Sequence, residues 1–546
     1  MKTIKLFWPA FLYIAVSALV LRIIFSFNPG LVKTYLNDYK TALIPVAILT
    51  PLLFFLPAFE KKLPKKLARW DILAATGVIT AFTCIYALFA VGQYGRYESD
   101  AWDLGIYSQA VYHLSQGEAP AVSFKAPFRE GGSDLSRGAT RNFILQDHFE
   151  PILLLLAPFY RVWPSPALLL LVQLIMVCFV GAWGVFLLSK KLLKSGLAAI
   201  LILIGFYFFT GVQIALNSDF HSNTLSVAFF PWIILCLENN KLKRAFFLSC
   251  LALLFNEVVS IFIFAIGFFA LFRRKWRWGF LVMLTSFAWF MIVTKWVIPS
   301  FGHNPYAYAS EYPFSEIIRL NLGIKPLLTT IFFPHVKVAT ILQHLFSTGF
   351  LALFSPAVAL LAPSFLRAFL HPSYFVAWGI SRHYWVESFM FAGIAVIYGI
   401  KFLTGEKKLI TIFLALLFVS QSIYHGLTTS TAWFGTKPMR YYFEYLERLR
   451  PTLPTYVLNS VIKNYIPKNA KVAAQNTILP HMANRGTVYL LPQVFDAEYV
   501  IFNTKDQDFA PLDENSRLTM IEEFASSSEW DDIFDFEGIR LFKKKQ

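Results

Sequence analysis

Long apolar runs dominate this sequence, and they constrain its fold more than any motif does. Many of them reach about 18 to 22 residues, the length of an α-helix that crosses a bilayer. Hydrophobic residues make up 56% of the 546 positions and charged residues 15%, a composition typical of multi-pass membrane proteins rather than soluble ones. The sequence therefore predicts a mainly α-helical, polytopic membrane protein with about eleven to thirteen membrane segments.

Basic residues gather in the short connections between the apolar runs. They lie at 61–69, 190–194, 241–244, 273–277 and 401–408. Because loops rich in Lys and Arg stay on the cytoplasmic side, these connections predict a plasma-membrane protein with a cytoplasmic N-terminus. The same placement explains the net charge of +16 without nucleic acid as a partner.

Three parts follow from this topology. Residues 1–70 are predicted to form an additional N-terminal transmembrane hairpin, and residues 71–427 the main membrane module. Residues 428–546 are predicted to be extracytoplasmic, and their alternating short strand and helix patterns indicate a small α/β domain.

One apolar stretch, 245–272, has basic residues at both ends and the polar pair Asn256–Glu257 in its middle. A single straight helix would place one basic end outside the cell. We therefore expect a hairpin that turns at Asn256–Glu257. A carboxylate near the bilayer centre costs about 2.5–3.5 kcal/mol, so Glu257 is expected to face a polar cavity.

The predicted first large external loop, 93–151, carries most of the chemistry. A short amphipathic helix at 104–114 is expected to lie on the membrane surface, and 151–164 is too short to span and is expected in the interface. Asp103 precedes that helix and is either its N-cap or a general base. Near its two ends, the loop is expected to place Glu98, Asp100, Asp103, Asp147, His148 and Glu150 close to a membrane face.

Two Asp/His pairs are expected at the same membrane face. They are Asp147–His148 and Asp219–His221. Carboxylates and imidazoles bind divalent ions such as Mg²⁺ or Mn²⁺, but these residues could equally hydrogen-bond one another or hold the hydroxyl groups of a ligand. The spacing is too loose to choose among these alternatives.

Two clusters contain arginine. Arg382–His383–Tyr384 lies just outside a span and is either an interfacial anchor or a clamp for a phosphate group. His481 and Arg485 share one face of a short helix in the C-terminal part, where an ion pair or a docking contact is the favoured interpretation.

Six segments, in order, resemble a family of predicted prokaryotic membrane proteins that is catalogued as a domain of unknown function and grouped with the GT-C glycosyltransferase superfamily. The likeness runs from about residue 71 to the end, although Asn256–Glu257 stands where the family pattern has Lys–Glu–Asp. The segments are AWDLGIYSQAVYHLSQGE, DHFEPILLLLAPFYRVWPSP, DFHSNTLSVAFFPW, FNEVVSIF, SRHYW and IPKNAKVAAQNTILPHMANRGTVYLLP.

The resemblance implies a GT-C-like glycosyltransferase at the extracytoplasmic face. Its donor would be a polyprenyl-phosphate-linked sugar and its acceptor a glycan, lipid or protein. Asp103 would be the catalytic base, with Asp100 and Glu98 behind it, and membrane lipids would surround the spans.

We expect the remaining candidates to bind substrate. Arg382 and His383 would contact the leaving phosphate, with Arg141 in reserve, and the carboxylates would stabilise positive charge on the sugar. The expected substrate-binding residues are Asp147, His148, Asp219, His221, Glu257, Arg382, His383 and Tyr384.

The alternative is a non-enzymatic transporter or lipid-binding membrane protein. It would use Glu257 and the Asp/His pairs as a coupling site. The polar groups of a transporter should run through both halves of the membrane, whereas these are expected near the outer face, which favours the enzyme.

Overall fold

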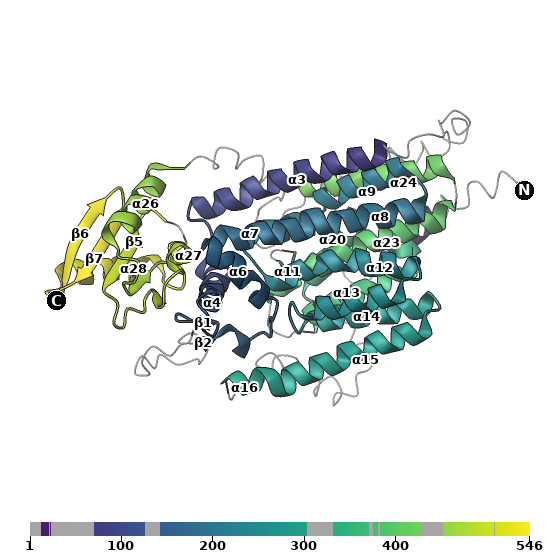
Figure 1. Cartoon of the computed structure of the whole chain (residues 1–546). Coiled ribbons are helices and arrows are strands. Elements are labelled where there is room, and N and C mark those ends of the chain that lie inside the picture. Colours follow the sequence, from purple (N-terminus) through teal and green to yellow (C-terminus); the bar gives the residue numbers. More distant parts are fainter. Residues whose placement is uncertain are drawn as a thin grey trace, which may run out of the picture.

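A bundle of helices forms the larger part of the protein, and a small mixed sheet lies beyond one end of it (Figure 1). The computed structural model describes residues 12–20, 22, 70–125, 142–302, 331–370, 375–380, 383–405, 407–428, 451–506 and 508–545. Of the predicted N-terminal hairpin, only 12–20, 22 and 70 belong to these residues.

Within the described ranges, five helical stretches are long and apolar enough to cross a membrane, or six when one bent pair is included. The bent pair is α9 (Gly196–Phe208) with α10 (Thr210–Asn217), which meet at 50°. The five are α3 (Trp70–Gly95), α7 to α8 (Pro166–Leu193), α15 to α16 (Trp276–Phe301), η10 to α23 (His383–Thr404) and most of α24 (Lys408–Thr428).

Shorter apolar helices complete the bundle. The prediction of a mainly helical, multi-span membrane protein is confirmed, although several of its predicted segments are built from these shorter pieces. They are α6 (Leu153–Val162), α11 to α12 (Ser222–Glu238), α13 (Leu242–Leu253), α14 (Val259–Phe272), α20 (His335–Ser347) and η9 with α21 (Pro356–Phe369).

The stretch 245–272 folds as the expected hairpin. The chain breaks between α13 and α14 at 254–258, around Asn256 and Glu257. The ends away from the break lie together, because Arg273 after α14 makes a bidentate ion pair of 2.8 and 2.9 Å with Glu238, just before α13. A break at this depth needs partners for its backbone groups, and the site below supplies them.

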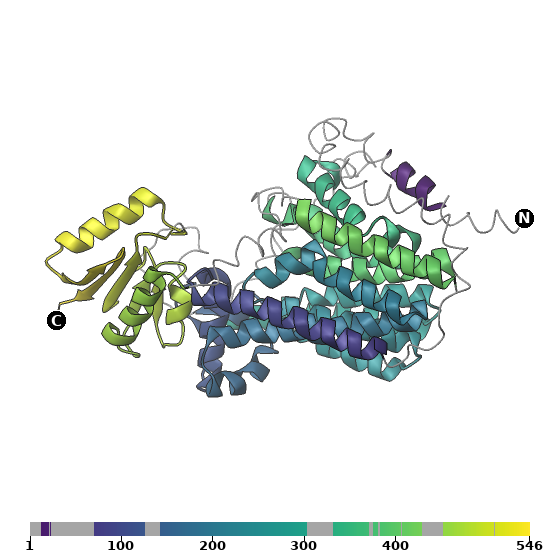
Figure 2. The ribbon, with the colours of Figure 1, turned by 90° about the horizontal axis from the view of Figure 1, so that it is seen from above.

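The described basic loops, which follow α8, α12, α14 and α23, lie at one end of the bundle, and the described part of the loop 93–151 lies at the other (Figure 1). At the basic end, Lys190 at the close of α8 lies 3.0 Å from Asp71 at the start of α3. At the opposite end, α3 leads into α4 (Ile106–Ser115) and contacts the C-terminal part of the chain (Figure 2). The charges are therefore segregated along the long axis, as the positive-inside pattern predicts.

The C-terminal part forms a five-stranded sheet with the order β4-β3-β5-β7-β6. Strand β3 is parallel to both neighbours, whereas β7 is antiparallel to β5 and β6. All the predicted strands and helices of this part are present. They are α26 (Leu453–Tyr465), β3 (Val472–Ala474), α27 (Leu479–Met482), β4 (Val488–Leu490), β5 (Tyr499–Asn503), α28 (Glu514–Ser526), β6 (Trp530–Phe536) and β7 (Ile539–Lys544).

Helix α4 differs from its prediction in one respect. It was expected on the membrane surface with one polar face exposed, yet its polar residues Ser108, Gln109 and His113 are at most 1% exposed. The reason is tertiary packing. Gln109 donates from Nε2 to the carbonyl oxygen of Arg485 in the C-terminal part (3.3 Å) and to Oγ of Ser123 (3.0 Å). The polar face of α4 is therefore an internal contact surface.

One glycine on α23 permits close packing and provides a stability test. A Cβ added to Gly399 would lie 2.0 Å from the carbonyl oxygen of Leu351, whereas one added to Gly393 on the same helix would meet nothing within 4 Å. We expect Gly399→Ala to lower the free energy of unfolding by about 1–3 kcal/mol through overpacking.

Thermal denaturation of the purified protein in detergent checks this expectation. Gly393→Ala is the matched control, and it should unfold at or slightly above the wild-type temperature because Ala favours helix over Gly by about 1 kcal/mol. Equal melting temperatures for Gly399→Ala and Gly393→Ala would contradict the close packing of α23.

Candidate functional site

The acids of the first loop are organised by a single π-helical turn, η3 (Ala101–Gly105), between α3 and α4. Asp100 caps this turn, because its Oδ1 accepts the N–H of Asp103 at 2.8 Å. Asp219 reaches across from the α10–α11 connection, and its Oδ2 accepts the N–H of Asp100 at 2.8 Å. The capping role considered for Asp103 thus belongs to Asp100, and the side chain of Asp103 is available for other contacts.

Asp103 pairs with His221. Its Oδ1 lies 3.1 Å from His221 Nε2, and His221 Nδ1 lies 2.9 Å from the carbonyl oxygen of Asp219. A carbonyl oxygen can only accept, so Nδ1 carries a proton; a second proton must then lie between Nε2 and the Asp103 carboxylate. The pair is therefore an imidazolium with a carboxylate, or its proton-transferred equivalent.

The ring of His383 stacks on His221, with centroids 3.4 Å apart and planes at 26°. Tyr384 contacts His383 in turn, at 4.2 Å between ring centroids. Two members of the predicted Arg382–His383–Tyr384 cluster therefore adjoin the Asp103–His221 pair. Arg382 itself and Arg141 lie outside the described residues.

Burial and like charge set the protonation of this cluster. Burial raises the pKa of Asp219 well above its usual value, and the nearby carboxylates of Asp100 and Asp103 raise it further. Burial lowers the pKa of His221, but Asp103 and the Asp219 carbonyl raise it by more, so the net shift is upward. The cluster is thus arranged to retain protons.

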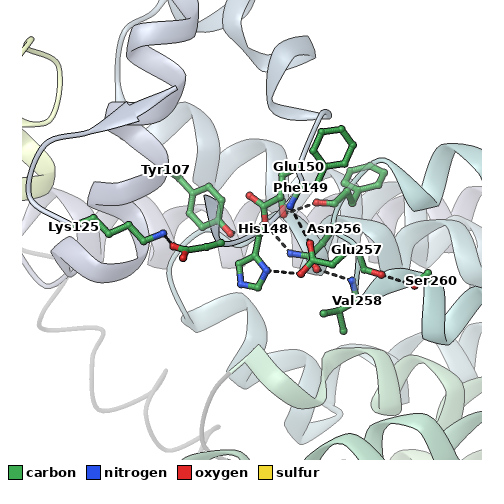
Figure 3. Close-up of polar contacts among 12 residues, drawn as sticks. Tyr107, Lys125, His148, Phe149, Glu150, Asn256, Glu257, Val258 and Ser260 are labelled. Carbon is green, nitrogen blue, oxygen red and sulfur yellow. Dashed lines mark hydrogen bonds and ion pairs between the residues drawn. The ribbon is translucent and has the colours of Figure 1, made fainter. Parts of the chain in front are cut away.

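A second polar network lies around the α13–α14 break (Figure 3). Glu257, which is fully buried, accepts from His148 Nδ1 at 2.7 Å and from the backbone N–H of Phe149 at 3.0 Å. Asn256 donates from Nδ2 to Glu150 Oε1 at 2.9 Å. The break in the hairpin is therefore occupied by the loop that precedes α6.

Tyr107 on α4 lies between the two networks. Its hydroxyl donates to Glu150 Oε1 at 3.0 Å, and its ring lies edge-on to His221, 6.0 Å between centroids. Burial raises the pKa of Glu150, which is 1% exposed. The acids around η3 and those around the α13–α14 break thus form one polar region at a single end of the bundle.

The structure brings together some predicted site residues and separates others. Asp100, Asp103, Asp219, His221 and His383 form one cluster, while His148 and Glu257 belong to the second network. The remaining two acids have cationic partners: Glu98 binds Arg96, and Asp147 binds Lys125.

No group of three or more His, Cys, Asp or Glu side chains in the described residues is arranged to hold a metal ion. The four residues considered as ligands have separate partners: Asp147 binds Lys125, and Asp219 accepts the N–H of Asp100. His148 contacts Glu257, and His221 contacts Asp103. They do not form a single ligand set.

A buried polar group beside this cluster was missed from the sequence. Glu387, in the first turn of α23, is fully buried; its Oε1 accepts from Asn223 Nδ2 at 3.0 Å, and its Oε2 lies 4.0 Å from Arg367 Nη2. Arg367 also donates to the carbonyl oxygen of Tyr384. An acid inside an apolar span is itself a functional signal, and Glu387 could have been found that way.

The raised pKa of Asp219 predicts an unusual pH dependence for Asp219→Asn. A carboxyl group whose pKa is higher in the folded state binds more protons there, so the free energy of unfolding falls as pH rises above about 3.9, the unfolded-state value. The variant amide does not titrate and can still accept the Asp100 N–H. Its melting temperature relative to wild type should therefore rise between about pH 4 and pH 8.

Asp513→Asn is the control, because the pKa of Asp513 is shifted in the opposite direction to that of Asp219. Hydrogen bonds from Ser516 lower the pKa of Asp513, so any advantage of the wild type over this variant is present above about pH 4 and lost below it. Melting curves in detergent across this pH range measure both trends. If the melting temperature of Asp219→Asn relative to wild type fell as the pH rose, a protonated Asp219 would be contradicted.

Glu257 is expected to stabilise the hairpin break. Glu257→Ala leaves the Phe149 N–H without its acceptor and His148 without its anion, and the loss of a buried partner costs about 3–5 kcal/mol. Glu257→Gln keeps one acceptor oxygen and should cost less. Thermal unfolding measures both, with the surface variant Glu523→Ala as control; equal melting temperatures for Glu257→Ala and wild type would refute this role.

Comparison with known proteins gives the chain a family. Residues 96–528 match a family described as "Predicted membrane protein (DUF2079)". No curated protein matches the chain. The matched region contains η3, both polar networks and strands β3, β4 and β5 of the C-terminal sheet, so the site lies within the shared part of the family. The chain belongs to this family of multi-pass membrane proteins, DUF2079.

Proposed function

We propose that this protein is a membrane glycosyltransferase that moves a sugar from a polyprenyl phosphate to an acceptor at the extracytoplasmic face. Asp103 is the catalytic base in this proposal. The observation that carries it is the Asp103–His221 pair, an oriented carboxylate at the end of the bundle opposite the basic loops. The GT-C resemblance supports the class of reaction.

Accessibility distinguishes Asp103 from its neighbours. Its side chain is 22% exposed, whereas Asp219 is 7% exposed and is engaged with the Asp100 N–H. Asp100 caps η3. Asp103 is therefore the acid of this cluster that is best placed to meet an acceptor hydroxyl, and the other two orient the turn that carries it.

The reaction would proceed by inversion. The acceptor oxygen attacks the anomeric carbon, the bond from that carbon to the phosphate oxygen breaks, and the acceptor proton passes to Asp103. The polyprenyl phosphate leaves with the electron pair of the broken bond. Cationic groups must stabilise its charge; His383 and Arg367 are the candidates among the described residues, and Arg382 is the one expected from the sequence.

The placement of charge supports the orientation. The described basic loops lie at one end and the acid cluster at the other, which by the positive-inside pattern supports a position of the cluster outside the cytoplasm. Exposed apolar side chains on α15, among them Phe280, Leu284 and Phe287, provide a lipid-facing surface. The three-part division at residues 70 and 427, with an extracytoplasmic C-terminal domain, belongs to the same proposal.

Asp103→Asn tests the proposal. The change should lower transfer at least a hundredfold, because general-base catalysis contributes about 10²–10⁴-fold, while the melting temperature stays within a few degrees of wild type. The assay uses polyprenyl phosphates that carry radiolabelled hexoses or pentoses, with the purified protein in liposomes, and measures release of polyprenyl phosphate.

Glu118→Gln is the matched control. Glu118 lies in the same loop and binds His113, away from the cluster, so this variant should transfer sugar at the wild-type rate. Normal transfer by Asp103→Asn would refute Asp103 as the base. Movement of label across the liposome membrane without release of polyprenyl phosphate would refute the transferase and support the transporter.

A further inference from the structure

The start of η3 is held by acceptors from distant parts of the chain. The N–H of Ala101 donates to Oδ1 of Asn476 at 2.9 Å, across 375 positions of sequence. The N–H of Asp100 donates to Asp219, and the N–H of Asp103 donates to Asp100. Because the first N–H groups of a helical turn have no partner inside the turn, these three acceptors determine where the turn lies.

Asn476 is a rigid acceptor. It comes two residues after β3, the strand between β4 and β5, and is 3% exposed. The residues on both sides of Asn476 are held by hydrogen bonds. Gln475 accepts the N–H of Asn503 at the end of β5, and Thr477 donates to Asp506. The sheet therefore presents the Asn476 amide in one position.

The C-terminal part also contacts the chain on both sides of η3. On the preceding side, the ring of His481 stacks on Tyr94 and Tyr97, at 4.2 and 3.8 Å between centroids. On the following side, Ser123 donates from Oγ to the carbonyl oxygen of Val488 at 2.6 Å. The docking contact expected at His481 is therefore confirmed, and it stacks on aromatic rings rather than on an acid.

The packing of η3 against this surface leaves little room. A Cβ added to Gly105, the last residue of the turn, would lie 3.0 Å from Leu479 Cδ2 on α27. The turn is therefore fixed on one side by Asn476 and α27, while Asp103 on its other side contacts His221. A shift of the turn away from Asn476 would move Asp103 relative to His221.

We propose that Asn476 is a positioning residue for the η3 turn, so that the C-terminal part of the chain completes the site around Asp100 and Asp103. Asn476 acts through the backbone of Ala101 and does not contact the reacting atoms. The catalytic consequence rests on the proposed glycosyltransferase function. The structural consequence, a turn held by Asn476, does not depend on it.

A pair of asparagine variants tests the proposal. Asn476→Ala removes the acceptor for the Ala101 N–H. Asn484→Ala is the matched control, because Asn484 also bonds across the same interface, to the Tyr160 hydroxyl and the Pro164 carbonyl oxygen, both at 2.7 Å, but does not touch η3. Both variants lose docking contacts, and only one of them loses the contact with the turn.

The kinetic readout separates positioning from general destabilisation. We expect Asn476→Ala to lower kcat about tenfold to a hundredfold, the range for a displaced catalytic group, with KM for the radiolabelled polyprenyl-phosphate sugar unchanged. Asn484→Ala should keep the wild-type kcat. Asn476→Asp, which retains an acceptor oxygen at the start of the turn, should recover most of the loss. Equal kcat values for the two alanine variants would overturn the proposal.

Hydrogen–deuterium exchange gives a readout that needs no activity. Peptides that cover residues 98–106 should exchange faster in Asn476→Ala than in wild type, and at the wild-type rate in Asn484→Ala. If the wild type transfers no sugar but this difference is present, the proposed function fails and the positioning stands. If both variants exchange alike, the positioning fails whatever the activity.

Discussion

The backbone N–H groups at the start of η3 need hydrogen-bond acceptors, and the protein supplies them from three separate parts of its sequence. Asp100 lies in the loop itself, Asp219 between two membrane helices and Asn476 at the end of a strand in the C-terminal sheet. Each unpartnered buried N–H would cost about 1–3 kcal/mol, so the loop, the bundle and the sheet are joined energetically at this one turn. The position of Asp103 depends on that junction.

Two buried carboxylates follow the same principle, since each has partners from remote elements. Glu257 binds His148 and the Phe149 N–H, and Glu387 binds Asn223 and approaches Arg367. The contacts of Glu257 hold the broken hairpin α13–α14 against the loop that precedes α6, and those of Glu387 hold the start of α23 against α11 and α21. Irregular backbone at membrane depth is stable only where protein or a polar cavity satisfies it, and these side chains provide that environment.

Much of the fold could be predicted because it follows from local patterns. Apolar length indicated the spans, basic residues at both ends of 245–272 indicated the hairpin, and alternating short strand and helix patterns indicated the C-terminal α/β domain. The site was less accessible to this reasoning. Asp100 and Asp103 are three residues apart, and only contacts in the folded protein distinguish them: Asp100 accepts the N–H of Asp103 and caps η3, whereas Asp103 contacts His221. Tyr107 and Asn476 carry no sequence signal for their roles.

The sequence by itself determined that this chain is a multi-pass helical membrane protein with its acids at one end and a small α/β sheet at its C-terminus, because hydropathy and charge act residue by residue along the chain. Only the tertiary structure decided which acids meet. It placed Asp219 beside Asp100, His221 beside Asp103 and Asn476 against Ala101, since these contacts join segments more than a hundred residues apart. It also covered the polar face of α4, which local periodicity alone assigns to the surface.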